Sequence, residues 1–183
     1  FEIALKKKIS DNLLGLLNEN KQPILKMTGT LGKVLELPRY IAHRDVMKWT
    51  EYCDAEQNRQ AVAAINVVRH QFAPASEIDH ELRDSALKLI DIVSPDSRLL
   101  KIRNDIFVER ELADYKTFFD SVEKSPMTKE QRVASVVMED RNLLVAAAGS
   151  GKTSTVVGKI GYALLKKLVT PDEILVLAYN NHA

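Results

Sequence analysis

The stretch 145-VAAAGSGKTS-154 decides how the last third of this sequence is expected to fold. An uninterrupted apolar run, residues 143–148, leads into a glycine-rich segment, and a helical apolar pattern follows it directly. A buried strand that turns through glycines into a helix brings backbone N–H groups to the helix N-terminus, where they attract a phosphate group. The stretch therefore predicts a phosphate-binding loop between a strand and a helix.

The residue types in this loop suit a nucleotide triphosphate. The end of the pattern G-x-x-x-x-G-K-[ST] is present as 151-GKT-153, whereas Ala146 occupies the position of the first glycine. Residues 149–151 can turn their N–H groups toward a phosphate because glycine allows close approach of the backbone. We expect Lys152 to bind the β- and γ-phosphates and the Thr153 hydroxyl to ligate Mg²⁺. The alternative, a glycine turn with an incidental lysine, is disfavoured by the flanking strand and helix.

A second apolar run, 174-ILVLAY-179, follows the turn 170-TPDE-173 and is the next strand candidate. Strand, glycine loop, helix and strand form a βαβ unit, and continuously apolar strands are typical of a parallel sheet that is buried on both faces. Two parallel strands do not make a stable sheet alone. We therefore interpret this part as the truncated start of a larger α/β domain.

The sequence upstream of Pro126 has a helical apolar period almost throughout. We expect a first helix with its apolar stripe at residues 5–17, and a looser connection at 23–38, where two prolines and two glycines interrupt the period. Further helical runs are predicted at 40–72, 78–93, 99–122 and 129–138. The fold class is thus a mainly α N-terminal region, 1–124, followed by the α/β segment, 125–183. A helical hairpin or arm used for packing or interaction is the simplest interpretation of the first region.

Composition places few limits on function. The 183 residues are 45% hydrophobic and 28% charged with a net charge of +1, which is ordinary for a globular protein and neither supports nor excludes a nucleic-acid partner. The single cysteine, Cys53, allows no intrachain disulfide, so we expect a packed apolar side chain in a reducing compartment. No apolar run approaches 18 residues, so we expect no membrane span and a cytoplasmic location. We interpret the start at Phe1, without a leader, as an internal cut.

Three motifs in order carry a resemblance to a known family: 127-MTKEQ-131, 143-LLVAAAGSGKTS-154 and 174-ILVLAYNNHA-183. This arrangement resembles the opening of superfamily 1 DNA helicases of the UvrD/Rep type, whose phosphate loop also begins with alanine. The stretch 115-YKTFFDSVEKSPMTKEQ-131 is similar to the segment that precedes the motor in one branch of that family. The resemblance covers roughly residues 112–183 and implies the start of a RecA-like P-loop NTPase domain. Residues 1–111 resemble the helical N-terminal extension of that branch only in their position before the motor.

The resemblance implies nucleotide-binding roles. Gln131 matches the glutamine that reads the adenine edge, although Thr128 and Gln131 also have the spacing of a helix capping box, which needs no ligand. Lys152 and Thr153 take the catalytic phosphate and magnesium roles described above. The full expected ATP-binding set is Gln131, Ala148, Gly149, Ser150, Gly151, Lys152, Thr153 and Ser154.

The resemblance also implies DNA contacts near the end of the chain. Tyr179 is a candidate for stacking on a base of single-stranded DNA, and the alternative is an aromatic residue that closes the core at a strand end. Asn180, Asn181 and His182 lie where contacts with the DNA backbone are expected. His182 has no partner at metal-ligand spacing. Two departures weaken the likeness locally: Ala147 replaces a frequent glycine, and Ser154 replaces an arginine that lies near adenine in several relatives.

The implied function is an ATP-dependent 3′→5′ DNA helicase or translocase that uses Mg²⁺ and acts on single-stranded or partly duplex DNA. We expect the carboxylates and arginines needed for hydrolysis to lie beyond residue 183, so this chain alone should neither hydrolyse ATP nor unwind DNA. Two alternatives stay open: a different phosphate-loop enzyme such as a nucleotide kinase, and a helical interaction module with a remnant nucleotide site.

Overall fold

The computed structural model describes residues 1–53, 58–147 and 149–177. They form two compact units, Phe1–Arg103 and Asn104–Ala183, which we describe separately. The unit boundary falls inside a helix. The predicted domain boundary after residue 124 is a different division of the chain and stays a prediction.

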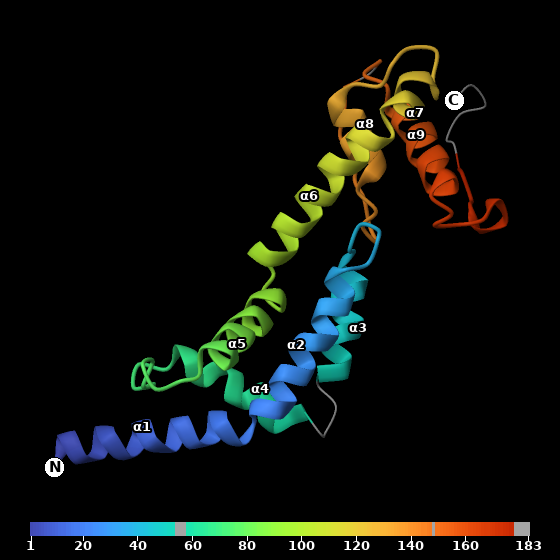
Figure 1. Ribbon diagram of the computed structural model, residues 1–183. Coiled ribbons are helices and arrows are strands. Elements are labelled where there is room, and N and C mark those ends of the chain that lie inside the picture. The colour runs from blue at the N-terminus through green and yellow to red at the C-terminus, as the bar shows by residue number, and fades with distance from the viewer. Residues whose placement is uncertain (54–57, 148, 178–183) are drawn as a thin grey trace. The chain divides into compact units, whose positions relative to one another are not determined.

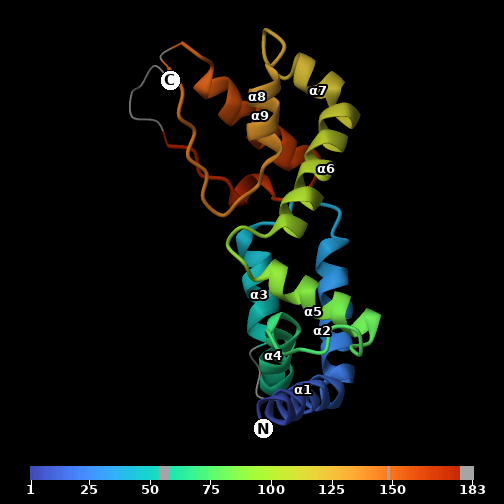
Figure 2. The ribbon, with the colours of Figure 1, turned by 90° about the vertical axis from the view of Figure 1, so that its left-hand side faces the viewer.

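The first unit is built from helices around a central one. Helix α2 (Lys21–Leu35) packs against α3 (His43–Cys53), α4 (Arg59–Ile65) and α5 (His80–Ile92), and α1 (Glu2–Glu19) precedes it (Figures 1 and 2). A short 3₁₀ turn, η2 (Asn66–Arg69), joins α4 to the chain that leads to α5. Their apolar faces share one core, and Cys53 is buried in it as expected.

The prediction of a loose connection at 23–38 is wrong, because α2 occupies most of that stretch. Pro23 lies in the first turn of α2, where backbone N–H groups have no partner within the helix, so its missing N–H costs little. Each helical glycine costs about 1 kcal/mol relative to alanine. Burial of Ile24, Met27 and Leu31 outweighs that cost, at about 1.5–3 kcal/mol for each side chain.

The predicted run 40–72 is divided in the structure. Helix α3 ends at Cys53, α4 begins at Arg59, and the four residues between Cys53 and Asn58 lie outside the described residues. The turn that precedes α3 is fixed from a distance, because Arg103 donates from Nε to Leu35 O at 3.0 Å and from Nη1 to Arg39 O at 2.7 Å. An arginine fork is suited to this task because it presents several donors in one plane.

The second unit contains the end of α6 (Arg98–Asp114), α7 (Lys116–Ser121), α8 (Lys129–Val136), α9 (Lys152–Leu165) and the 3₁₀ turn η3 (Pro171–Glu173). Helices α8 and α9 lie side by side in Figures 1 and 2. Gly158 permits this close approach, since a Cβ there would lie 3.0 Å from Ser135 Oγ of α8, and also 2.5 Å from the Cε of Met127. None of the described helices is long and apolar enough to cross a membrane.

The expected strands are not formed within 143–147 and 174–177, the parts of those runs that the structure describes. Leu143 is 89% exposed and Leu175 is 80% exposed. A strand needs a neighbour to satisfy its N–H and C=O groups, and no described segment pairs with either run. The mainly helical part of the fold prediction is thus confirmed, and the described residues form helices without a sheet. The α/β domain stays a prediction.

Part of the apolar surface of α9 is exposed. The side chains of Val156 and Val157 both belong to this exposed part. The buried residues of α9 lie on the face that packs against other helices of this unit, namely Thr155, Gly158, Tyr162 and Ala163. Helix α9 thus has an apolar face that the described residues leave uncovered.

Candidate nucleotide-binding site

The glycine loop adopts a tight turn at the N-terminus of α9. Gly149 and Gly151 have φ values of +76° and +84°, a left-handed conformation that favours glycine. The amide of Ser150 donates to Ala147 O at 3.3 Å, and the Ser150 hydroxyl donates to the same oxygen at 2.7 Å. Gly151 is the N-cap of the 14-residue helix α9, so the loop lies at the positive end of its dipole. This geometry suits an anion.

Lys152 and Thr153 lie in the first turn of α9 and are exposed. The Lys152 ammonium donates to Ala146 O at 2.9 Å and to Ala147 O at 2.7 Å, so it folds back over the loop backbone. A phosphate oxygen is a stronger acceptor for this ammonium than a neutral carbonyl. An anion bound at the loop would therefore offer this lysine a stronger acceptor than the two carbonyls.

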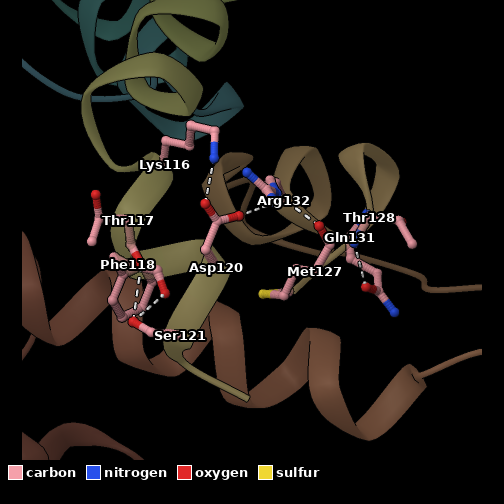
Figure 3. Close-up of polar contacts among 9 residues, drawn as sticks. All are labelled: Lys116, Thr117, Phe118, Asp120, Ser121, Met127, Thr128, Gln131 and Arg132. Carbon is pink, nitrogen blue, oxygen red and sulfur yellow. Dashed lines mark hydrogen bonds and ion pairs between the residues drawn. The ribbon is translucent and has the colours of Figure 1, made fainter. Parts of the chain in front are cut away.

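Gln131 joins the beginning of α8 to the glycine loop. Its Oε1 accepts from the Thr128 backbone N–H at 2.8 Å, and its own N–H donates to Thr128 Oγ1 at 3.4 Å, which completes a capping box (Figure 3). Its Nε2 also donates to Ser150 O at 3.3 Å. The capping interpretation is thus confirmed, and the same side chain contacts the loop.

Gly151 is required for this contact. A Cβ built on Gly151 would clash with Nε2 of Gln131, so a side chain at this position would push the glutamine away. The two bonds also fix the orientation of the amide, because Oε1 faces Thr128 and Nε2 faces Ser150. One N–H and one lone pair of the Gln131 amide remain for a further partner.

Buried hydroxyl groups of α8 and α9 hold the end of the glycine loop. Ser135 Oγ donates to Gln131 O at 2.8 Å and lies 3.4 Å from Thr155 O, so it connects α8 with α9. Thr155 Oγ1 donates to Gly151 O at 3.0 Å. Every hydroxyl in this group has a partner, which holds the end of the loop against α8 without an unsatisfied buried group.

An ion pair connects α7 with α8 (Figure 3). Arg132 Nη2 lies 2.6 Å from Asp120 Oδ1, and Arg132 Nε donates to Met127 O at 2.8 Å. Lys116 also pairs with Asp120. The hydrogen bond from Lys116, and then the one from Arg132, hold the pKa of the Asp120 carboxyl below its ordinary value.

A half-buried lysine donates hydrogen bonds to carbonyl groups at the C-terminal end of α8. The Lys159 ammonium donates to Ala134 O at 3.1 Å and to Val137 O, and burial lowers its pKa. It borders an apolar groove of about 640 Å³ between α8, α9 and residues 142–144. A cation at a helix C-terminus also interacts favourably with the helix dipole.

The structure brings together most of the residues predicted from the sequence. Gln131, Gly149, Ser150, Gly151 and Lys152 form one connected group, and Thr153 and Ser154 continue it into α9. Ala148, Tyr179, Asn180 and Asn181 lie outside the described residues.

The sequence motifs do not predict the side chains that hold the start of α8, Asp120 and Arg132. Asp120 is separated from Arg132 by 12 residues along the chain, and no short motif relates them.

Magnesium has one predicted protein ligand in this chain, the Thr153 hydroxyl. Among the described residues, no cluster of three or more His, Cys, Asp or Glu side chains could hold a metal ion. A single hydroxyl fits a magnesium ion that is held mainly by phosphates and water. The loop therefore suits a metal that arrives with its nucleotide.

Comparison with known proteins agrees with this geometry. Residues 127–183 match the family described as UvrD/REP helicase N-terminal domain. DNA helicase IV of Escherichia coli (strain K12) is 34% identical over 128 residues, which are 70% of this chain and 18% of the relative. The chain thus spans less than a fifth of that relative's length. A match of 128 residues also exceeds the stretch 112–183, so the similarity extends into the helical region. No solved structure matches the chain.

Proposed function

Because residues 127–183 belong to the UvrD/Rep helicase N-terminal domain family, we propose that this chain contributes the first nucleotide-binding elements of an ATP-dependent 3′→5′ DNA helicase. ATP with Mg²⁺ binds at the glycine loop, and single-stranded or partly duplex DNA is the track. The protein works in the cytoplasm, with the DNA. The observation that supports the proposal is the hydrogen bond between Gln131 Nε2 and Ser150 O, which joins the side chain that we propose reads adenine to the glycine loop.

The phosphates are held by three groups of this chain. Backbone N–H groups at the N-terminus of α9 face the anion, and the helix dipole adds to the attraction. Lys152 exchanges the carbonyls of Ala146 and Ala147 for phosphate oxygens. Thr153, in the first turn, offers its hydroxyl to the magnesium ion that accompanies the nucleotide.

The base is selected by the remaining donor and acceptor of Gln131. Adenine presents an acceptor, N7, next to a donor, the N6 amino group, whereas guanine presents two acceptors at the same edge. An amide that offers one N–H and one lone pair matches adenine and places an oxygen against guanine O6. The proposed site therefore prefers ATP over GTP.

Hydrolysis and unwinding belong to the complete helicase. Catalysis of phosphoryl transfer needs carboxylates that hold the metal and position water, together with arginines that stabilise the transition state. Asp172 and Glu173 lie in η3, and Glu173 is used to cap that turn through Thr170. We propose that Tyr179, Asn180 and Asn181 contact single-stranded DNA, and that this chain alone has no ATPase activity.

Equilibrium titration with a fluorescent ATP analogue in Mg²⁺ tests the nucleotide site. We expect Lys152→Ala to weaken binding by at least about tenfold, since loss of a charge-assisted bond costs about 1.5–3 kcal/mol. Lys124→Ala, an exposed lysine away from the loop, is the matched control and should leave affinity unchanged. Equal affinities for wild type and Lys152→Ala, or ATP hydrolysis by the purified chain, would contradict the proposal.

A further inference from the structure

The turn that leads into α8 is fixed on three sides at one residue, Met127. Its amide donates to Phe119 O at 3.1 Å, and its carbonyl accepts from Arg132 Nε at 2.8 Å. Its side chain is buried against Gly158 of α9. Because Thr128 follows directly, the position of Met127 also sets the position of the capping box.

Asp120 determines where the Arg132 guanidinium points. One part of the fork binds Met127 O, and the other binds Asp120 Oδ1 at 2.6 Å (Figure 3). The Arg132 side chain is only 17% exposed, and that of Asp120 is 31% exposed, so water screens this pair less than it would a pair on an open surface. A planar fork held at two points has little freedom left.

We propose that Asp120 and Arg132 are positioning residues for the choice of nucleobase, acting through Met127 and Thr128 on the side-chain amide of Gln131. This inference rests on the proposed function of the site. Among the described residues, the pair forms no hydrogen bond or ion pair with the loop or with a predicted phosphate-binding residue. Substitutions of Asp120 or Arg132 should therefore change base selection without changing phosphate binding.

The amide orientation depends on two bonds, and a small shift at Met127 would break one of them. Thr128 N–H lies 2.8 Å from Oε1, and Ser150 O lies 3.3 Å from Nε2. If Met127 moves by about an ångström, Thr128 moves with it, and the bond from the Thr128 N–H to Oε1 passes the useful range for a hydrogen bond. The amide then loses one of the two bonds that fix its orientation. An amide that is no longer held forms its paired bonds with adenine N7 and N6 less often and presents its oxygen to guanine O6 less often, so selectivity falls while phosphate binding persists.

The test measures the ratio of the dissociation constants for fluorescent GTP and ATP analogues in Mg²⁺, on the whole chain. In Asp120→Asn and in Arg132→Lys we expect this ratio to fall about five- to tenfold toward unity, with GTP affinity unchanged. Lysine keeps the charge but cannot bind two acceptors in one plane. Arg132→Lys therefore tests the positioning of Met127 in a variant that we expect to fold normally. Lys116→Met is the matched control, since it removes only the outer partner of Asp120.

Each other outcome has a definite meaning. Wild type that prefers ATP, with variants that keep the preference, overturns the inference and leaves the nucleotide site intact. An equal loss of ATP and GTP affinity shows that the pair only supports the fold, which also overturns it. Wild type that binds both nucleotides alike refutes base reading by Gln131 together with the inference. Wild type that binds neither refutes the proposed function itself.

Discussion

Gly151 shows how one residue can serve both the backbone and a neighbouring side chain. Its φ of +84° is strained for any other residue, and a Cβ there would clash with Gln131. Gly149 has a similar φ of +76°, but a Cβ at that position would meet nothing within 4 Å. Substitution of Gly149 therefore introduces backbone strain alone, whereas substitution of Gly151 introduces strain and also disrupts the contact with Gln131.

We expect Gly151→Ala to be the more damaging of two matched substitutions. Both Gly149→Ala and Gly151→Ala carry backbone strain of about 1–2 kcal/mol. Only Gly151→Ala displaces Gln131, so it should also reduce the preference for ATP over GTP. Thermal unfolding and nucleotide titration of both variants check this. Equal effects of the two substitutions on the ATP preference would contradict the assignment.

Asp120 predicts a pH dependence that can be measured on the folded chain. Its pKa is lowered, so the ionised carboxylate contributes stability above the unfolded value near 3.8, and the contribution is lost as the pH falls through the folded value. We expect wild type to be more stable than Asp120→Asn at pH 7 and pH 5. The difference should shrink as the pH falls below 3.8 through the lowered folded value. Urea unfolding of both proteins at pH 7, 5 and 3 tests this, and an undiminished difference at pH 3 would contradict it.

At the scale of elements, α9 is the helix on which the second unit depends. Its first turn carries the loop, its middle packs closely on α8 through Gly158, and its last turns are bound to α6. The Tyr162 hydroxyl donates to Glu111 Oε2 at 2.6 Å, and Lys166 Nζ lies 3.0 Å from Glu111 Oε1. Burial and Glu111 raise the pKa of Tyr162, so it stays a donor at neutral pH.

Removal of this donor should destabilise the second unit. Tyr162→Phe leaves the buried Glu111 carboxylate with fewer partners, and we expect a loss of about 1–3 kcal/mol in the free energy of unfolding. Tyr52→Phe, in the first unit, should change it by less than about 0.5 kcal/mol. Urea unfolding of both variants gives the comparison. A Tyr162→Phe variant as stable as wild type would show that Glu111 is satisfied without the tyrosine.

At the scale of the whole molecule, uncovered apolar surface is the main unsatisfied feature of the described residues. The segments 143–145 and 174–177 and one face of α9 are apolar, and several of their side chains are more than half exposed. Exposed apolar surface combined with unpaired backbone groups promotes association. The chain should therefore associate with itself at micromolar concentration.

Sedimentation velocity over a range of concentrations tests this expectation. The double variant Leu143→Ser with Leu175→Ser should reduce association by removing two of the most exposed apolar side chains of these segments. Ile3→Ser is the matched control, since Ile3 is 85% exposed but lies on α1. A larger effect of Ile3→Ser would place the association at the N-terminal helix instead.

Features that depend on near neighbours along the chain can be predicted from the sequence. The helical periods, the glycine turn of the loop and the capping box at Thr128 each follow from residues that are a few positions apart. Two local patterns are misleading. Pro23 suggests a break although it lies in the first turn of a helix, and two apolar runs suggest strands although no described segment pairs with them.

Which distant side chains meet depends on the packing of the helices. The contacts from Gln131 to Ser150, Arg132 to Asp120 and Tyr162 to Glu111 join residues that are 19, 12 and 51 positions apart. Such contacts depend on how α6, α7, α8 and α9 pack, and packing depends on shape and burial that no local period encodes. The phosphate loop is thus written in the sequence, whereas the orientation of the glutamine beside it is a product of the fold.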